Sequence, residues 1–213
     1  TGMRTVMKNP QIWLIGLITC ILYAPSTTFA ELWGLPFIQH VYHLSPLHAS
    51  YCISLMLLGF TVSAPIAGFL SDYIDRRKPL FIISSLLTLI FSVAIIFYPH
   101  PMNLYTLYFV LFGFGFAYGG EIVGFAAACD ISPQSLSGTA VATVNMLTMI
   151  SGIILQPLVG YILDANWHGA MANGVRVYSP HAYQLGLSSL PITMLIGLVL
   201  SLLWREKRVN QAA

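Results

Sequence analysis

Six long apolar stretches, separated by short polar turns, dominate this sequence. A helix of about 20 apolar residues crosses the hydrocarbon core of a bilayer. A lipid environment also accounts for a charged content of only 8%, because a soluble domain carries about 25% charged residues. We therefore predict an all-α membrane protein with transmembrane helices over residues 11–40, 47–73, 79–98, 104–129, 136–163 and 183–204.

Lysine and arginine are distributed unevenly between the two sides of the predicted bundle. If six helices alternate in direction, one side holds only Arg176, in the loop from Ala165 to Pro180. Loops rich in Lys and Arg stay in the cytoplasm. We therefore expect both ends of this segment on the cytoplasmic side of a bacterial inner membrane. The basic residues assigned to that side are Arg4, Lys8, Arg76, Arg77, Lys78, Arg205, Lys207 and Arg208.

Composition argues against several other classes of protein. A formal net charge of +2 is too small to indicate nucleic-acid binding. Cys20, Cys52 and Cys129 lie within apolar runs, where free cysteine behaves as a small apolar residue, so we expect no disulfide framework, metal site or cofactor. The chain opens at Thr1, which leads us to expect a longer parent protein.

A short internal repeat links the second and fifth apolar stretches. Pro65, Gly68 and Asp72 recur as Pro157, Gly160 and Asp164 with the same spacing, an offset of 92 residues. Because three helices is an odd number, a second copy of a three-helix unit must be inverted in the membrane. Inverted repeats of this kind are typical of secondary transporters. A chance match of eight residues is the alternative.

The turn between the second and third helices carries the most specific motif. It runs from Gly68 through Leu70 and Asp72 to Arg76 and Arg77. This pattern resembles the major facilitator signature Gly-x-Leu-Ala-Asp-Arg-x-Gly-Arg-Lys. The resemblance implies a conformational latch formed by Gly68, Asp72, Arg76 and Arg77. The sequence departs from the signature at Tyr73 and Asp75, where the family prefers Arg and Gly.

A second segment resembles the penultimate helix of many major facilitators. It contains Ser137-Gly138-Thr139-Ala140, followed by Asn145, Gly152 and the run from Gln156 to Gly160. The family has twelve helices in two six-helix bundles, with the solute between them. The resemblance therefore implies that this chain is the C-terminal bundle of a transporter. Its implied partners are the lipid bilayer, a small-molecule solute and the N-terminal half of the same polypeptide.

Two acidic residues fall inside the predicted helices. Charges in lipid are costly, so Glu31 and Glu121 are candidates for solute binding or proton coupling. The family places the first and fourth helices of each bundle along the central cavity. Because these helices run in opposite directions, we expect the two carboxylates in opposite halves of the membrane, one near each gate. The alternative is that each glutamate only stabilises helix contacts.

Further candidates share helix faces with these acids or lie near them. Tyr23 and Thr27 precede Glu31 by eight and four residues, which places all three on one face of a regular helix. Glu121 lies in a glycine-rich run in which helices can pack closely or bend. On the fifth helix, Asn145 and Gln156 share a face and can bind a solute or join helices.

Three histidines gather between the first and second helices, and two other functions remain open. His40, His43 and His48 have spacing that allows a surface metal, but solvated loop histidines are commoner. A channel would need a selectivity ring or filter segment, and none is evident in the sequence. An intramembrane enzyme would need a motif such as His-Glu-x-x-His or Gly-x-Ser-x-Gly, and neither occurs. We therefore predict a secondary transporter that is not an enzyme, with a channel or structural subunit as the alternative.

Overall fold

A computed structural model describes residues 2–98, 102–172 and 174–206 of the chain. Within these ranges six helical spans are long and apolar enough to cross a membrane, which confirms the predicted number. Lys207, Arg208 and the predicted turn at residues 99–101 lie outside the described residues. The spans are Pro10–Val41, Pro46–Ile74, Lys78–Phe97, Leu104–Asp130, Gln134–Ala165 and Pro180–Leu203.

Four of the spans are built from more than one helical segment. The short helix α1 (Gly2–Met7) precedes the first span. The elements of the spans are α2 (Pro10–Ala24), the π-helix η1 (Pro25–Trp33) and α3 (Gly34–Val41) in the first, α4 (Pro46–Ile74) in the second, α5 (Lys78–Phe97) in the third, α6 (Leu104–Tyr118), the 3-10 turn η2 (Gly119–Ile122) and α7 (Val123–Asp130) in the fourth, η3 (Gln134–Leu136) and α8 (Ser137–Ala165) in the fifth, and α9 (Pro180–Leu187) and α10 (Ser189–Leu203) in the sixth.

Capping side chains determine where several of these helices begin. The side chains of Asn9, Ser45, Asn103 and Ser179 accept backbone N–H groups in the first turns of α2, α4, α6 and α9. Proline occupies the first turn of α2, α4 and α9, where its missing N–H costs nothing. The predicted loop before α9 contains a short antiparallel hairpin of β1 (Met171–Ala172) and β2 (Val175–Arg176).

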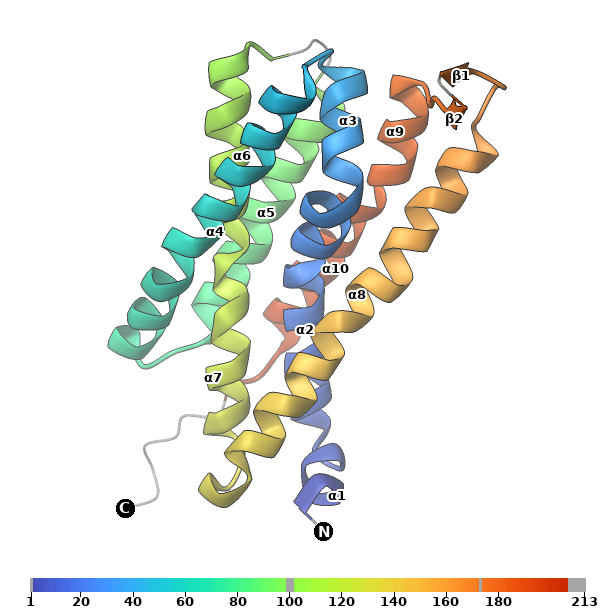
Figure 1. The fold of residues 1–213 in the computed structure, drawn as a ribbon. Coiled ribbons are helices and arrows are strands. Elements are labelled where there is room, and N and C mark those ends of the chain that lie inside the picture. The colour runs from blue at the N-terminus through green and yellow to red at the C-terminus, as the bar shows by residue number, and fades with distance from the viewer. Residues whose placement is uncertain (1, 99–101, 173, 207–213) are drawn as a thin grey trace.

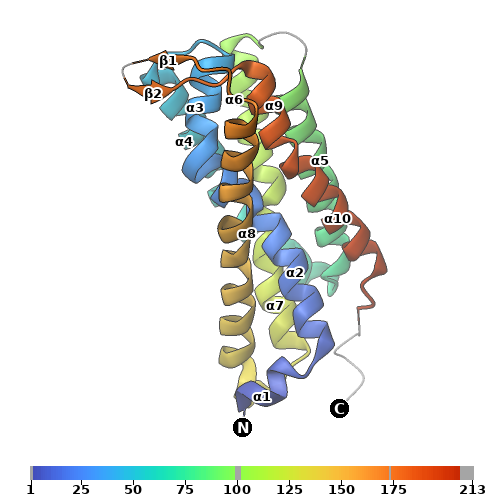
Figure 2. The same ribbon diagram turned by 90° about the vertical axis from the view of Figure 1, so that its right-hand side faces the viewer.

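The packing of the helices follows the predicted inverted repeat. The first span packs on α8, the fourth span packs on α4, and α5 packs on α10 (Figures 1 and 2). If the first, second and third spans change places with the fourth, fifth and sixth, respectively, the same three pairs result. The repeat is also visible within α4 and α8, which have 29 residues each and contain Pro65 and Pro157 at nearly the same position.

Glycines allow the fourth span to pack closely against its neighbours. A Cβ atom built at Gly115 would lie 1.8 Å from the carbonyl oxygen of Met56, and one at Gly120 would lie 2.0 Å from Ser84 Oγ. Only glycine permits so short an approach between helices. The predicted close packing in this glycine-rich run is confirmed.

The first span lies at the centre of the bundle, and α4 is its most open helix. In the most apolar window of each span, 78% of residues are buried in Pro10–Val41 but only 22% in α4. Figure 1 shows α2 and α3 between α4 and α8, while Figure 2 shows α5 and α10 on the side of the molecule opposite α4. The central span is therefore surrounded by helices that leave one broad face of the bundle uncovered.

Candidate functional site

The first span changes from α-helix to π-helix at its middle. Pro25 begins the π-helix η1, which extends to Trp33. Proline has no N–H to bond to the preceding turn, and a π-helix is one way to absorb that defect. Thr27 and Glu31, which are predicted to share a face, differ in exposure. Thr27 is 5% exposed, whereas Glu31 lies on the exposed surface.

Hydrogen bonds fasten the π-helix to α8. The Gln156 side-chain amide donates to the Thr27 carbonyl at 2.7 Å, and the Trp33 indole N–H donates to the Gln156 carbonyl at 3.1 Å. The hydroxyls of Thr27 and Ser151 lie 3.1 Å apart. Thr27 and Gln156 therefore join helices, which favours the structural alternative for both residues over solute binding.

The fourth span is interrupted in the middle as well. The 3-10 turn η2 begins at the adjacent glycines Gly119 and Gly120, which weaken a regular helix. Its third residue, Glu121, is only 4% exposed. The Glu121 carboxyl makes no hydrogen bond or ion pair with any described residue. A buried carboxyl group without a partner is costly, and such groups mark functional sites in membrane helices.

A group of polar side chains connects the two interrupted helices. We call Tyr23, Ser26, Glu31, Tyr118 and Glu121 the central polar cluster. Both glutamates influence the hydroxyls of both tyrosines electrostatically, and Ser26 lies against those hydroxyls. Both carboxylates therefore lie within electrostatic range of the same two hydroxyls, and their placement in opposite halves of the membrane stays a prediction.

Exposure decreases stepwise across the central polar cluster. Glu31 is exposed, Tyr23 is half-buried, and Tyr118 is fully buried. The buried Tyr118 hydroxyl has no hydrogen-bond partner among the described residues. Sequence reasoning missed Tyr118 and Ser26, although Tyr118 lies immediately before the glycine pair that predicted the bend.

The two interruptions are related by the internal repeat. Adding the offset of 92 residues to η1 gives residues 117–125, which contain η2. Substrate and ion sites of repeat-built transporters lie at the midplane, where discontinuous helices of both repeats meet. The structure thus interrupts corresponding helices at the place where the polar side chains gather.

The surroundings of Asn145 differ from those of Gln156. Its side chain is exposed on α8 and makes no hydrogen bond with the described residues. Gln156, eleven residues later, is bound to η1. Of the two predicted α8 residues, only Asn145 is available to an incoming solute.

The predicted latch is built around Arg77. Its guanidinium donates to Asp72, to Ser71 Oγ at 2.6 Å and to Asp130 Oδ2 at 2.8 Å, and its backbone N–H donates to Glu206. Partial burial acts to lower the pKa of Arg77, but hydrogen bonds to Asp130 and Asp72 outweigh it, so the pKa is raised. Arg77 therefore joins the ends of α4 and α7 to the segment after α10.

Other latch residues differ from expectation. Arg76 is exposed and makes no ion pair within the described residues. A Cβ atom at Gly68 would meet nothing within 4 Å, so this glycine admits no neighbouring helix of this chain. Asp75 has φ 52° and ends α4 in a left-handed conformation, which explains why the family prefers glycine at that position.

The opposite end of the bundle carries a related ion pair. Asp164, the repeat counterpart of Asp72, binds Arg176 Nη1 at 2.7 Å and accepts a hydrogen bond from Tyr178 at 2.6 Å. The Arg176 guanidinium also lies 4.7 Å from the centre of the Trp167 ring. Each repeat thus ends in an aspartate that holds an arginine, at opposite ends of the bundle.

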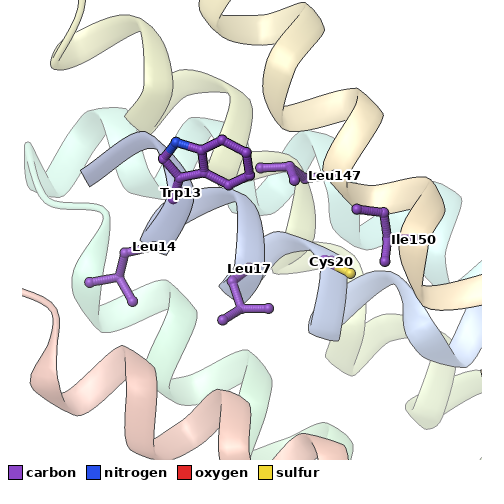
Figure 3. A pocket seen from close by; sticks show the side chains of 6 residues that line it. All are labelled: Trp13, Leu14, Leu17, Cys20, Leu147 and Ile150. Atoms are coloured by element: carbon purple, nitrogen blue, oxygen red, sulfur yellow. The ribbon is translucent and has the colours of Figure 1, made fainter. Parts of the chain in front are cut away.

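An apolar pocket of about 440 Å³ lies between α2 and α8, away from the central polar cluster. Figure 3 shows the indole of Trp13 and the side chains of Leu17 and Leu147 around it. The lining exposes no polar surface, so it offers no hydrogen bond to a polar solute. The central polar cluster is consequently the better candidate for the functional site.

Comparison with known proteins decides the family. The profile of the Major Facilitator Superfamily matches residues 8–212. The chain belongs to this superfamily. As a major facilitator chain, it is related to transport proteins with differing solutes. It is 26% identical over 171 residues to a probable hexose phosphate transport protein of Chlamydia pneumoniae, 24% identical over 214 residues to the probable metabolite transport protein CsbC of Bacillus subtilis, and 27% identical over 151 residues to the riboflavin transporter RibZ of Clostridioides difficile.

These relatives are much longer than the present major facilitator chain. The matches cover 77%, 98% and 69% of this chain but 37%, 42% and 33% of the three relatives. Among solved structures, the partially occluded inward-open xylose transporter XylE of E. coli matches with a TM-score of 0.69 and 16% identity. That match covers 92% of this chain and 50% of XylE. The shared fold is therefore that of half a major facilitator.

Proposed function

We propose that this chain is the C-terminal half of a proton-coupled secondary transporter of a small organic solute. Glu121 carries the proposal, because its buried carboxyl has no partner and lies where the fourth span is interrupted. The partial coverage of longer relatives supports an N-terminal six-helix partner half. This bundle would rock against that half around a site at the midplane, giving alternating access.

In this proposal Glu121 exchanges a proton as its surroundings change. Inside the closed bundle the uncharged, protonated carboxyl is favoured, because burial penalises charge. When rocking admits water to the central polar cluster, the charged form becomes favourable and the proton leaves. Tyr23 and Glu31 extend the cluster toward the exposed surface and would provide the route for the proton.

The solute would contact the uncovered face of the bundle. Glu31 and Asn145 are both exposed, and neither side chain makes a hydrogen bond with a described residue, so we propose them as contacts of the solute. A solute with hydroxyl groups could bind the Asn145 amide and the Glu31 carboxylate. The relatives act on different solutes, so hexose phosphate, xylose and riboflavin form the first panel of compounds to test.

The proposed orientation places α1 in the cytoplasm. Arg4 lies in α1 and Lys8 follows it, and Arg76, Arg77 and Lys78 lie at the turn from α4 into α5 at the same end of the bundle, whereas Arg176 lies at the other end (Figure 1). The positive-inside rule then assigns the first group to the cytoplasm of a bacterial inner membrane. Cysteine accessibility at residues 8 and 172, probed from each side of intact cells, tests this assignment.

The central experiment separates proton coupling from solute movement. The whole parent protein is reconstituted in liposomes, and accumulation driven by a proton gradient is compared with solute exchange at equal concentration. We expect Glu121→Gln to abolish gradient-driven accumulation and to preserve exchange, because a neutral amide mimics the protonated carboxyl. Glu121→Asp, which keeps the carboxyl, should retain part of the accumulation.

Other outcomes would count against the proposal. Full accumulation by Glu121→Gln would show that Glu121 does not couple transport to protons. Solute flux without exchange kinetics would favour the channel alternative. Loss of exchange in Glu31→Gln, with normal membrane insertion, is the expected result if Glu31 contacts the solute.

A further inference from the structure

Three imidazoles line one pocket at the end of the bundle opposite α1. The pocket has a volume of about 360 Å³ and is lined by His40, His43 and His168, with Gln39, Tyr178 and Ser179 beside them. His40 lies in the last turn of α3, His43 follows the first span, and His168 comes from the loop after α8. None of the three imidazoles makes a hydrogen bond with a described residue.

This membership differs from the histidine cluster that the sequence predicts. His48 is absent from the pocket lining, and its Nδ1 lies 2.9 Å from Ser45 Oγ at the start of α4. His168, 125 residues after His43, takes its place. The folding of the β1–β2 hairpin loop over the end of α3 creates the pocket.

The pocket is held in shape by its surroundings. The His40 ring stacks on Tyr183 with centroids 6.0 Å apart and planes 17° apart. His43 has φ 54°, a left-handed conformation that costs free energy in a residue other than glycine. The Trp167 indole donates to the Ala170 carbonyl at 2.8 Å, which fixes the loop carrying His168. Strained backbone of this kind is commonly found at binding sites.

The charged groups near the pocket are already paired. Asp164 is bound to Arg176 and Tyr178, and no Asp or Glu lines the pocket. The pKa of Arg176 is raised by its hydrogen bond to Asp164, and the pKa of Tyr178 is raised by burial and by the same carboxylate. Both groups therefore keep their protons at neutral pH.

The remaining titratable groups on the surrounding elements are histidines and tyrosines. Tyr42 and Tyr183 are buried, and the Tyr42 hydroxyl donates to the Ile95 carbonyl. His181 is exposed on α9 and His48 is at the start of α4. Imidazole is the side chain that ordinarily gains a proton between pH 8 and pH 5. The pocket lining therefore offers imidazole groups and no carboxylate.

We propose that this pocket binds a small oxyanion, a phosphate or carboxylate group, when its three imidazoles are protonated. Protonated imidazole has two N–H donors, and hydrogen bonds between charged groups are about twice as strong as neutral ones. The described residues contain no group of three ligands placed to hold a metal. The site is independent of the proposed proton coupling at Glu121.

The test is direct binding of inorganic phosphate to the whole parent protein in phosphatidylcholine nanodiscs, without transport. Calorimetric titration at pH 5.5 and pH 7.5 is carried out at equal ionic strength. We expect at least tenfold tighter binding at pH 5.5. The triple variant His40→Gln, His43→Gln, His168→Gln should lose that difference. His181→Gln, outside the pocket, should keep it.

A single variant serves as a control in case the triple variant does not fold. His168→Gln alone, with an unchanged thermal midpoint, should weaken phosphate binding at pH 5.5 at least threefold. Equal affinity at the two pH values in the wild-type protein overturns the proposal. So does undiminished binding by the triple variant, or binding of Zn²⁺ at pH 7.5 that the same variant loses.

A second arm identifies the source of the oxyanion. In nanodiscs that contain phosphatidylglycerol, a lipid phosphate would compete with the added ion and suppress its binding. Suppression therefore identifies a lipid headgroup, and unchanged affinity identifies a free anion. Both results support an oxyanion site. No transport is measured in this experiment. A negative phosphate-binding result would therefore not bear on the proposed function of Glu121, which is tested separately.

Discussion

At the scale of single residues, Tyr118 and Glu121 combine deep burial with a lack of partners. Tyr118 is fully buried with an unsatisfied hydroxyl, and Glu121 is 4% exposed. Buried polar groups in folded proteins are nearly always hydrogen-bonded, so each exception needs an explanation. In the proposed function, both groups lie beside the proton that Glu121 exchanges.

Removing the Tyr118 hydroxyl tests this explanation. We expect Tyr118→Phe to change the free energy of unfolding by less than about 0.5 kcal/mol, because no hydrogen bond is lost. Its gradient-driven accumulation of solute should nevertheless fall. Thermal unfolding and liposome uptake measure the two effects.

Tyr42→Phe is the matched control for that prediction. Its hydroxyl donates to the Ile95 carbonyl at 3.2 Å, so its loss should cost about 1 kcal/mol and leave uptake unchanged. A strongly destabilised Tyr118→Phe would contradict the assignment, because it would show that the hydroxyl has a structural partner.

At the scale of helices, the interruptions at η1 and η2 distinguish the first and fourth spans from α4 and α8. Pro65 and Pro157 lie inside α4 and α8, which remain helical over 29 residues each. The first span instead changes to a π-helix at Pro25. Proline alone therefore does not decide where a span is interrupted. Contacts of η1 with α8 stabilise the wide turn.

Two glycines on neighbouring helices should respond differently to alanine. Gly115→Ala places a Cβ atom 1.8 Å from the Met56 carbonyl oxygen, so we expect a destabilisation of about 1–3 kcal/mol. Gly68→Ala meets nothing within 4 Å and should change the stability of this bundle by less than about 0.5 kcal/mol. Denaturant unfolding in detergent compares the two variants.

Gly68→Ala should still impair transport if the partner half packs against it. The family signature places this glycine in the latch, yet no element of this chain approaches it. Normal transport by Gly68→Ala would show that no helix of the partner half comes close at this position. Gly115→Ala provides the comparison for a glycine whose neighbour lies within this chain.

At the scale of the whole molecule, Arg77 ties together three helix ends. Its partners Asp72, Asp130 and Glu206 come from three different segments of the chain. Lys78 adds hydrogen bonds to the carbonyls of Leu202 and Trp204, each at 2.7 Å. These contacts hold the ends of α4, α7 and α10 together as one unit.

Replacing Arg77 should weaken that unit equally at neutral and alkaline pH. We expect Arg77→Gln to lower the free energy of unfolding by about 1 kcal/mol, after allowing for solvent screening. Because the pKa of Arg77 is raised on folding, its contribution is complete below the unfolded pKa and is lost only above the folded one, and both lie above pH 10. The loss should thus be the same at pH 7 and pH 10.

Thermal unfolding at the two pH values checks this prediction, with Arg76→Gln as its control. Arg76 is exposed and makes no ion pair among the described residues, so its replacement should have little effect. A deficit in Arg77→Gln that disappears at pH 10 would mean that the guanidinium is not what holds the latch together.

The parent protein provides a further test at this scale. If this chain is half of a transporter, the coding sequence upstream should encode six more apolar spans. A fuller Gly-x-Leu-Ala-Asp-Arg-x-Gly-Arg-Lys signature should follow the second of them. Sequencing that region decides the matter, and a natural start near residue 1 would instead require the chain to dimerise.

The number of spans, their order and their inverted repeat were determined by the sequence alone, because apolar length and polar turns are local properties. The latch was also predictable in part, since Asp72 and Arg77 lie only five residues apart. Its partners Asp130 and Glu206 were not, because contacts between distant segments depend on how helices pack.

Only the tertiary structure decided which polar residues are free to act. A period of 3.6 residues did not reveal the π-helix that begins at Pro25, nor that Thr27 is buried while Glu31 is exposed. In the packed bundle, Gln156 is hydrogen-bonded to a neighbouring helix, and His168 lines the same pocket as His40. Burial and hydrogen-bond satisfaction are properties of the packed bundle, so no local pattern in the sequence contains them.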